Sequence, residues 1–419
     1  MKSVPETLSV RLVEEAYARL KGVVSLTPLQ LNARLSRKYG ATVYLKREDL
    51  QLVRSYKIRG AYNRMALLDA GERGRGVVAA SAGNHAQGVA FACGELRVRA
   101  DIYMPKNTPK QKVEQVRVLG GEWIAVHLVG DTFDESYALA KAHAEKESRT
   151  FIHPFDDVFV AAGQGTVGLE IAEQLGGPLD FVVVPVGGGG LVAGLGTYLK
   201  AKYPAVRVIG VEPEGAPSMS ASLKAGCVVT LPRIDKFVDG AAVAAVGKVS
   251  FDAAKSLIDI MTVVSEGKVC EEMVRLYQSD GIITEPAGAL SVAALDAVAD
   301  AIRGKTVICV VSGGNNDISR YPEIMDRALI YKGLKHYFIV DFPQRPNALR
   351  DYLDKVLGPN DDITLFEYIK KSNKETGPAL IGIELGDKKD LEPLLRRMGE
   401  AGFGYEALEK DSVLYRFLI

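Results

Sequence analysis

Lys57 is the residue whose neighbours most clearly suggest covalent chemistry. It lies in the segment SYKIRGA, between Tyr56 and Ile58 and shortly before Gly60. An amine among apolar neighbours is partly desolvated, which favours the neutral, nucleophilic form of lysine. Because most lysines lie on solvated surfaces, a surface role for Lys57 stays open at this point.

A run of four glycines could bind a phosphate. Gly187, Gly188, Gly189 and Gly190 follow an apolar, β-branched segment, and a helix-like segment starts at Leu191. Without Cβ atoms, successive backbone N–H groups can point at one anion, and a helix N-terminus adds unpaired donors. No Lys-Ser or Lys-Thr pair follows, so the loop is not a Walker loop.

The same run also fits a nicotinamide dinucleotide. Gly188, Gly190 and Ala193 match a G-x-G-x-x-A pattern, and Glu212 ends the next apolar segment, near where a ribose-binding acid would lie. The glycine run alone leaves the two ligands open. A nucleophilic lysine together with a phosphate site favours pyridoxal phosphate, held as a Schiff base.

Two further glycine-containing turns follow apolar segments. They are SAGNHAQG at residues 81–88 and SGGNN at residues 312–316. In open parallel sheets, ligands bind beyond the carboxyl ends of the strands. We therefore expect all three turns to face the same rim of one cleft.

The elements that must position these turns alternate between strand-like and helix-like patterns. An Ala-rich helix is expected at residues 132–147, and short apolar runs rich in β-branched residues predict buried parallel strands in an α/β sheet. These expected strands are at residues 77–80, 181–186, 206–211 and 306–311.

The pattern changes near Leu334. From there the order of expected elements is βαββαβ, which is typical of a small ferredoxin-like domain. The expected strands are at residues 336–342, 362–368, 379–385 and 415–419, and the expected helices are at residues 347–357 and 389–401.

Composition excludes several classes of function. The 419 residues carry 52 basic and 52 acidic side chains, so the formal net charge of zero argues against nucleic acid or an anionic membrane as the main partner. The N-terminus lacks the apolar core of a signal peptide, and no apolar run could span a bilayer. Four cysteines without a CxxC pair and five scattered histidines without HExxH predict a reduced, cytoplasmic protein with no metal centre.

Four segments, SYKIRGA, SAGNHAQG, PVGGGGL and SGGNN, resemble in this order the fold type II pyridoxal-phosphate enzymes, and among them the threonine dehydratases. The resemblance implies a catalytic domain over residues 1–333 with two open, twisted α/β subdomains, the smaller at roughly 52–155. The segment GLKHYFIVDFPQRPNALRDYL resembles the ACT-like regulatory domain of the short biosynthetic form, which carries one such unit. We therefore expect an ACT-like domain at residues 334–419.

The resemblance also implies roles for single residues. Lys57 would carry the cofactor and take the Cα proton of the substrate. Asn84 would contact the phenolic oxygen of the ring, although turn formation is the alternative, and Ser312 would face the pyridine nitrogen, with helix capping as the alternative. Glu285 resembles a family residue near the cofactor, and capping a helix is an equal alternative. The phosphate would be held by Gly187, Gly188, Gly189, Gly190 and the Leu191 amide, and the substrate carboxylate by Ser81, Ala82, Gly83, Asn84 and His85.

The implied reaction is dehydration and deamination of L-threonine to 2-oxobutanoate and ammonia, the first step of isoleucine biosynthesis, with L-serine as a secondary substrate. Ala82 stands where related serine racemases have a serine, so racemisation is disfavoured. Ser218 stands where relatives with a divalent-ion site have an acid, although Glu212 is present, so no essential divalent metal is expected. We further expect a homo-oligomer, a dimer or tetramer, with isoleucine as inhibitor and valine as an activating effector.

Two functions of other classes remain open in the sequence. A nicotinamide-dependent dehydrogenase is favoured only by the degenerate glycine pattern. A non-catalytic amino-acid sensor is the second, and the intact Lys57 argues against it.

Overall fold

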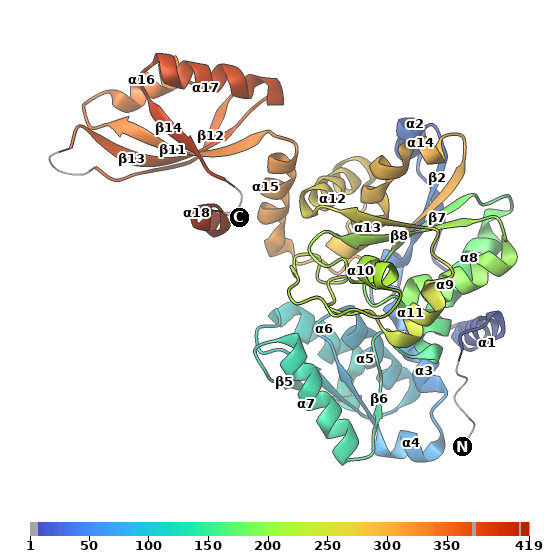
Figure 1. Cartoon of the computed structure of the whole chain (residues 1–419). Helices are drawn as coiled ribbons and strands as arrows, with labels where there is room; N and C mark the ends of the chain where they lie inside the picture. Colours follow the sequence, from blue (N-terminus) through green and yellow to red (C-terminus); the bar gives the residue numbers. More distant parts are fainter. Residues whose placement is uncertain (1–6, 371–373, 410–411, 419) are drawn as a thin grey trace. The chain divides into compact units, whose positions relative to one another are not determined.

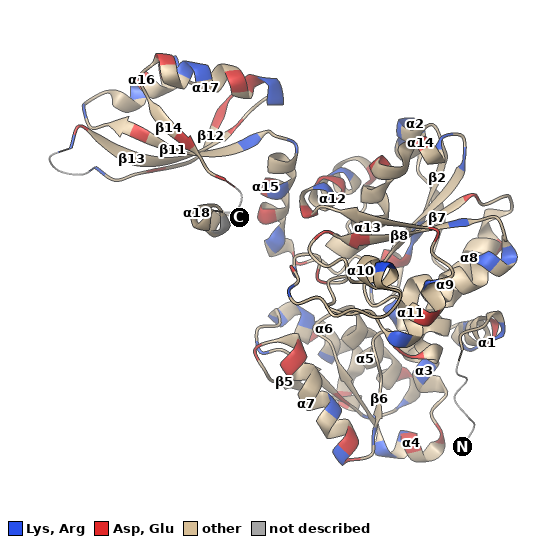
Figure 2. Cartoon of the chain, in the orientation of Figure 1, with Lys and Arg blue, Asp and Glu red and all other residues tan. Residues whose placement is uncertain are grey.

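The computed structural model describes residues 7–370, 374–409 and 412–418 (Figure 1). The chain forms two compact units, Met1–Glu266 with Leu276–Asn316, and Gly267–Arg275 with Asp317–Ile419. Compactness thus divides the chain earlier than the expected domain boundary after residue 333, which stays a prediction. Basic and acidic side chains are interspersed along the helices (Figure 2), in line with the zero net charge.

The larger sheet of the first unit has the order β1-β2-β10-β7-β8-β9. Its first pair is antiparallel and the other pairs are parallel. Every residue of β7 is buried, which explains its continuous apolar sequence. The strands are β1 (Leu29–Leu31), β2 (Thr42–Arg47), β7 (Phe181–Pro185), β8 (Arg207–Pro213), β9 (Ile260–Val264) and β10 (Thr306–Val311).

The smaller sheet of the first unit has the order β5-β4-β3-β6, and all of its pairs are parallel. Together with the larger sheet it gives the two α/β subdomains that the resemblance implies. The strands are β3 (Val77–Ala80), β4 (Ala100–Met104), β5 (Ile124–Leu128) and β6 (Thr150–Phe151).

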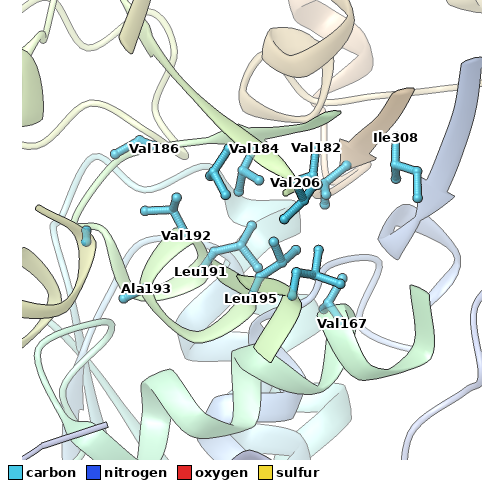
Figure 3. Close-up of a cluster of buried hydrophobic side chains, with 14 of the residues drawn as sticks. Val167, Val182, Val184, Val186, Leu191, Val192, Ala193, Leu195, Val206 and Ile308 are labelled. Atoms are coloured by element: carbon cyan, nitrogen blue, oxygen red, sulfur yellow. The ribbon is translucent and has the colours of Figure 1, made fainter. Parts of the chain in front are cut away.

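Helices cover both sheets. The helix after β7 begins at Gly190, and its Leu191 and Leu195 face Val182 and Val184 of that strand in the core (Figure 3). This packing fixes the glycine turn between strand and helix. The helices of the first unit are α1 (Val10–Leu20), α2 (Ala33–Tyr39), α3 (Lys57–Ala66), α4 (Ala70–Arg75), α5 (Asn84–Leu96), α6 (Lys110–Gly120), α7 (Phe133–Lys146), α8 (Val158–Leu175), α9 (Gly190–Lys202), α10 (Ser218–Ala225), α11 (Lys248–Ala254), α13 (Pro286–Ala293) and α14 (Ala299–Ile302). Helix α12 (Glu266–Asp280) belongs partly to each unit.

The second unit contains an antiparallel sheet of order β12-β13-β11-β14. Phe338, Ile381, Leu394 and Met398 lie in its core, and the strands and helices follow the expected βαββαβ order. Its elements are α15 (Tyr321–Tyr331), β11 (Lys335–Pro343), α16 (Ala348–Lys355), β12 (Asp362–Tyr368), β13 (Thr376–Glu384), α17 (Leu391–Glu400), β14 (Gly404–Ala407) and α18 (Val413–Leu418).

The position of the last expected strand is wrong. The fourth strand is β14, at Gly404–Ala407, whereas the expected strand at residues 415–419 overlaps the helix α18; residue 419 lies outside the described residues. The Ser412 hydroxyl accepts a hydrogen bond from the Tyr415 backbone N–H at 3.1 Å, as a helix-capping serine does. A short apolar run does not separate helix from strand, and the preceding serine was the available signal.

Within the described residues, every helix is too short or too polar to cross a membrane.

Candidate active site

Lys57 is the first residue of α3, and its amine is held from outside the helix. Its Nζ donates a hydrogen bond to the Pro154 carbonyl oxygen at 2.9 Å, and lies 5.3 Å from the centre of the Tyr56 ring. Burial lowers the pKa of Lys57 to about 8, although the Glu285 carboxylate acts in the opposite direction. A substantial fraction of this amine is therefore neutral near pH 8, as a nucleophile or base requires.

A buried ion network anchors α3 two residues beyond Lys57. The Arg59 guanidinium donates two hydrogen bonds to Glu48, both at 2.8 Å, and two to Glu170, at 2.6 and 2.9 Å. Lys46 adds a third ion pair with Glu170, at 2.6 Å. The three ion pairs are almost completely buried, and removing one partner of such a pair typically costs about 3–5 kcal/mol. The first turn of α3, which carries Lys57, is therefore firmly anchored.

The glycine run forms a turn that has little room for side chains. A Cβ on Gly188 would lie 2.1 Å from the Phe155 ring, and one on Gly187 would lie 3.0 Å from the Ala241 backbone. Gly189 has φ +91°, a conformation that other residues rarely adopt. The turn leads directly into the N-terminus of α9, whose first position has no side-chain cap. Free backbone donors and a cradle closed to side chains fit a phosphate group.

Asn84 has its amide fixed by two distant residues. Its Nδ2 donates to Glu285 Oε1 at 2.7 Å, and its Oδ1 accepts from Asn315 Nδ2 at 2.7 Å. These contacts are long-range, so turn formation alone does not describe the side chain. Because Oδ1 is engaged by Asn315, the second Nδ2–H of Asn84 is the group left to meet a cofactor oxygen.

Glu285 lies in the site and is not a helix cap. It precedes α13, yet its side chain makes no capping hydrogen bond, so the capping interpretation is wrong. The residue is only 5% exposed. Burial and the nearby Asp239 raise the pKa of Glu285 to about 7, while Lys112 and the Asn84 amide act in the opposite direction. In the sequence, the signal for such an internal partner was the position of Glu285, an acidic residue directly before the largely apolar, buried helix α13.

Ser312 directly follows β10 and is buried, and its hydroxyl donates to the Ala287 carbonyl oxygen at 3.3 Å. The next helical element begins only at Ile318, so the capping interpretation of Ser312 is also wrong. Sequence reasoning missed Asn315. Its Nδ2 donates to the Val53 carbonyl oxygen at 2.8 Å as well as to Asn84.

The turn at residues 81–85 opens the helix α5. Gly83 occupies the N-cap position without a side-chain cap, so backbone donors of the first turn are left for a ligand. Ser81 Oγ accepts from the Gly83 N–H at 3.2 Å, and Ala82 is half-buried beside it. His85 Nε2 bonds to the Ile152 carbonyl oxygen at 2.8 Å, and burial lowers the pKa of His85 to about 3. The free helix N-terminus suits a carboxylate, whereas the neutral His85 ring, which donates its Nε2–H to Ile152, adds no charge.

Glu212 does not serve the glycine turn. Its carboxylate accepts hydrogen bonds from the Met219 N–H at 2.5 Å and from the backbone and hydroxyl of Ser220, at 2.9 and 2.7 Å. It therefore fixes the start of α10. The dinucleotide interpretation loses the acid on which it depended.

A second candidate site lies in the second unit. A cavity of about 280 Å³ opens where β11 ends and α16 begins. Aromatic and proline side chains form much of its wall, and two of the lining side chains are basic. The lining residues are Phe342, Pro343, Gln344, Arg345, Pro346, Asn347, Ala348, Leu349, Phe366, Tyr368 and Lys370.

Two family profiles match the chain. The family described as "Pyridoxal-phosphate dependent enzyme" matches residues 20–313, and the "C-terminal regulatory domain of Threonine dehydratase" matches residues 326–418. The biosynthetic L-threonine dehydratase of Bacillus subtilis (strain 168) is 55% identical over 412 residues, 98% of each chain. That of Mycobacterium tuberculosis (strain H37Rv) is 54% identical over 415 residues, 99% of this chain and 96% of the relative.

Solved structures show the same architecture. The processed form of threonine deaminase isoform 2 from Solanum lycopersicum has a TM-score of 0.72 at 40% identity, covering 77% of this chain and 95% of that one. Maize serine racemase has a TM-score of 0.70 at 31% identity, covering 78% of this chain and 99% of that one.

Proposed function

The chain belongs to the pyridoxal-phosphate-dependent biosynthetic threonine dehydratases, and from that premise we propose which of its residues perform the reaction. It dehydrates and deaminates L-threonine to 2-oxobutanoate and ammonia, at the start of isoleucine biosynthesis. Membership in this family rules out the dehydrogenase and the non-catalytic sensor. The roles of single residues, the effectors and the assembly are our proposals.

One observation supports the assignment of Lys57 most strongly. Consecutive residues connect it to the phosphate cradle, because Pro154 accepts the hydrogen bond of its amine and Phe155 packs against Gly188. When bound, pyridoxal phosphate would supply an electron sink, which accepts the electrons that remain when the Cα proton of the substrate is removed. Lys57 would hold the cofactor, and its neutral Nζ would take that proton.

The remaining residues would bind and orient. The backbone N–H groups of residues 187–191 would hold the phosphate. The free Nδ2–H of Asn84 would meet the ring oxygen, and the neutral Ser312 hydroxyl would face the pyridine nitrogen. A hydroxyl stabilises charge on the ring less than a carboxylate would, which suits prompt loss of the β-hydroxyl.

The turn at residues 81–85 would bind the substrate carboxylate at the N-terminus of α5. Ala82 offers no group that exchanges a proton, so elimination is favoured over racemisation. L-Serine, which also carries a β-hydroxyl, would be a secondary substrate.

Spectroscopy and a product assay test this proposal together. The purified enzyme should show the visible absorbance of a lysine-bound cofactor, and borohydride should abolish both this absorbance and turnover. Peptide mapping of the reduced protein should place the label on Lys57. A label on any other lysine would contradict the assignment.

We propose that the cavity beside α16 binds isoleucine as an inhibitor and valine as an activator. Its aromatic wall suits a branched side chain, and Arg345 and Lys370 supply positive charge for a carboxylate. An effector can shift activity only if it binds one conformation better than another, and typical couplings are about 1–3 kcal/mol. Titration with isoleucine and valine should therefore move threonine kinetics in opposite directions.

We further propose a homo-oligomer, a dimer or tetramer. Four leucines near the N-terminus are more than half exposed, and a second copy would cover such surface: Leu26, Leu31, Leu50 and Leu52. Sedimentation measures the oligomeric state of wild type and of Leu52→Glu, which places a charge on this surface. A monomeric wild type would contradict the proposal. A cytoplasmic location is likewise proposed, supported by the biosynthetic relatives and by the low cysteine content, four in 419 residues.

A further inference from the structure

His153 is a half-buried histidine to which the proposed reaction gives no role. It lies in the crossover of residues 152–157 that connects the smaller sheet to α8. The crossover contacts three parts of the candidate site. Ile152 meets His85 of the carboxylate turn, Pro154 meets Lys57, and Phe155 meets the glycine turn.

The His153 ring holds the turn of this crossover through one nitrogen. Nδ1 accepts a hydrogen bond from the Asp156 N–H at 2.7 Å and from the Phe155 N–H at 3.3 Å. An imidazole nitrogen that accepts cannot carry a proton, so the ring is neutral with its proton on Nε2. Burial lowers the pKa of His153 to about 4, although Asp156 and Asp157 act in the opposite direction, so this form persists at neutral pH.

The turn presents two groups to the site. The Pro154 carbonyl oxygen accepts from Lys57 Nζ at 2.9 Å. The Phe155 carbonyl oxygen accepts from Ser250 Oγ at 2.9 Å, and its ring fills the space beside Gly188. A change in the turn would therefore move the amine acceptor and the wall of the cradle together.

We propose that His153 is a positioning residue for the Lys57 amine, acting through the turn that carries Pro154 and Phe155. The Pro154 carbonyl holds the amine in one place whenever it is not covalently engaged. Lys57 Nζ therefore meets each incoming reactant from the same position. His153 itself makes no bond to the reactant. This inference rests on the proposed role of Lys57.

The ring and the acceptor of His153 can be separated by substitution. The ring packs edge-on against Phe155, with centres 4.8 Å apart, and against Tyr137 at 6.0 Å. Phenylalanine keeps this packing and removes the acceptor. Asparagine removes the ring but places Oδ1 the same number of bonds from the backbone as Nδ1. The pair His153→Phe and His153→Asn therefore isolates the hydrogen bond.

The test compares the two full-length variants with wild type. We expect His153→Phe to lower kcat by roughly 10–100-fold with KM nearly unchanged, because small misplacement of a reacting group has effects of this size. The cofactor-stripped variant should also regain visible absorbance about tenfold more slowly when pyridoxal phosphate is added, since this rate reports the free amine. His153→Asn should restore both quantities to within about threefold of wild type.

The inference fails if His153→Phe keeps the wild-type kcat and rate of cofactor uptake, or if both variants are equally impaired. If His153→Phe does not fold, imidazole nitrogen NMR of the wild-type holoenzyme decides instead. The spectrum should show His153 with an unprotonated Nδ1 and no titration of this ring between about pH 6 and 8. Titration of His153 in this range would contradict the inference. Borohydride labelling of Lys57 in wild type tests the proposed function separately.

Discussion

The proposed catalytic site and the proposed effector cavity are built in opposite ways. In the catalytic site, residues from distant motifs are locked by long-range hydrogen bonds, such as those of Asn84 to Glu285 and Asn315. The effector cavity is lined almost wholly by the short stretch from Phe342 to Leu349, with Phe366, Tyr368 and Lys370 added from β12 and the residues after it. The first depends on many parts meeting at once, whereas the second depends on one strand-to-helix turn. Substitutions should therefore be severe in the first and graded in the second.

The largest effect is expected for Lys57→Ala. Loss of the amine removes both the attachment of the cofactor and the proposed base, so turnover should fall by at least about 10⁴-fold. The thermal unfolding midpoint should stay close to that of wild type. Product assay and calorimetry check this, and turnover within tenfold of wild type would contradict it.

Gly188→Ala tests whether the cradle is as tight as its geometry indicates. The new Cβ would lie 2.1 Å from the Phe155 ring, so the ring or the turn must move. We expect cofactor affinity to fall by about 100-fold, or about 2.7 kcal/mol. Gly177→Ala is the matched control, because the nearest atom to its Cβ would be 4.0 Å away. Equal affinities for the two variants, measured by absorbance titration, would show that the cradle is loose.

Arg345→Glu probes the effector cavity. Reversing this charge should raise the isoleucine concentration for half-inhibition by about 5–50-fold and leave kcat without effector unchanged. Lys355→Glu is the control, since Lys355 pairs with Asp351 at 3.3 Å, as Arg345 does at 2.5 Å, but does not line the cavity. If both variants respond to isoleucine as wild type does, the effector binds elsewhere.

Glu285→Gln is the subtlest change. A carboxyl whose pKa is raised to about 7 in the folded protein stabilises it below the unfolded pKa of 4.5, and this stability is lost as pH rises through 7. Between about pH 4.5 and 7, the unfolding free energy of wild type should fall by roughly 1–3 kcal/mol relative to that of the glutamine variant. Denaturant titrations at several pH values measure the difference in unfolding free energy between the two proteins. A difference that does not change with pH would mean that the pKa of Glu285 is not raised in the folded protein.

The sequence sufficed for the parts that are constrained locally. Glycines that tolerate no Cβ and apolar runs between them indicated the turns, the sheets and the βαββαβ order. It did not reveal the contacts that residues make across the fold. Asn315 and Glu285 take part through partners that are about two hundred residues or more away in the chain, and nothing in their own segments names these partners. The C-terminal helix was missed for a different reason, since a short apolar run fits either periodicity.

The ion network under α3 also sets an order of events during synthesis. Arg59 and Glu48 leave the ribosome early, but Glu170 is 111 residues further along than Arg59. At roughly 5–20 residues per second, the guanidinium waits about 6–22 s for half of its acceptors. Until α8 has been made, the helix that begins with Lys57 lacks half of its anchor, and the Pro154 acceptor lies between α3 and α8 in the chain. We therefore expect the Lys57 helix of the nascent chain to become anchored only after α8 has emerged, and cofactor capture to follow later, once the phosphate cradle at residues 187–191 has been made.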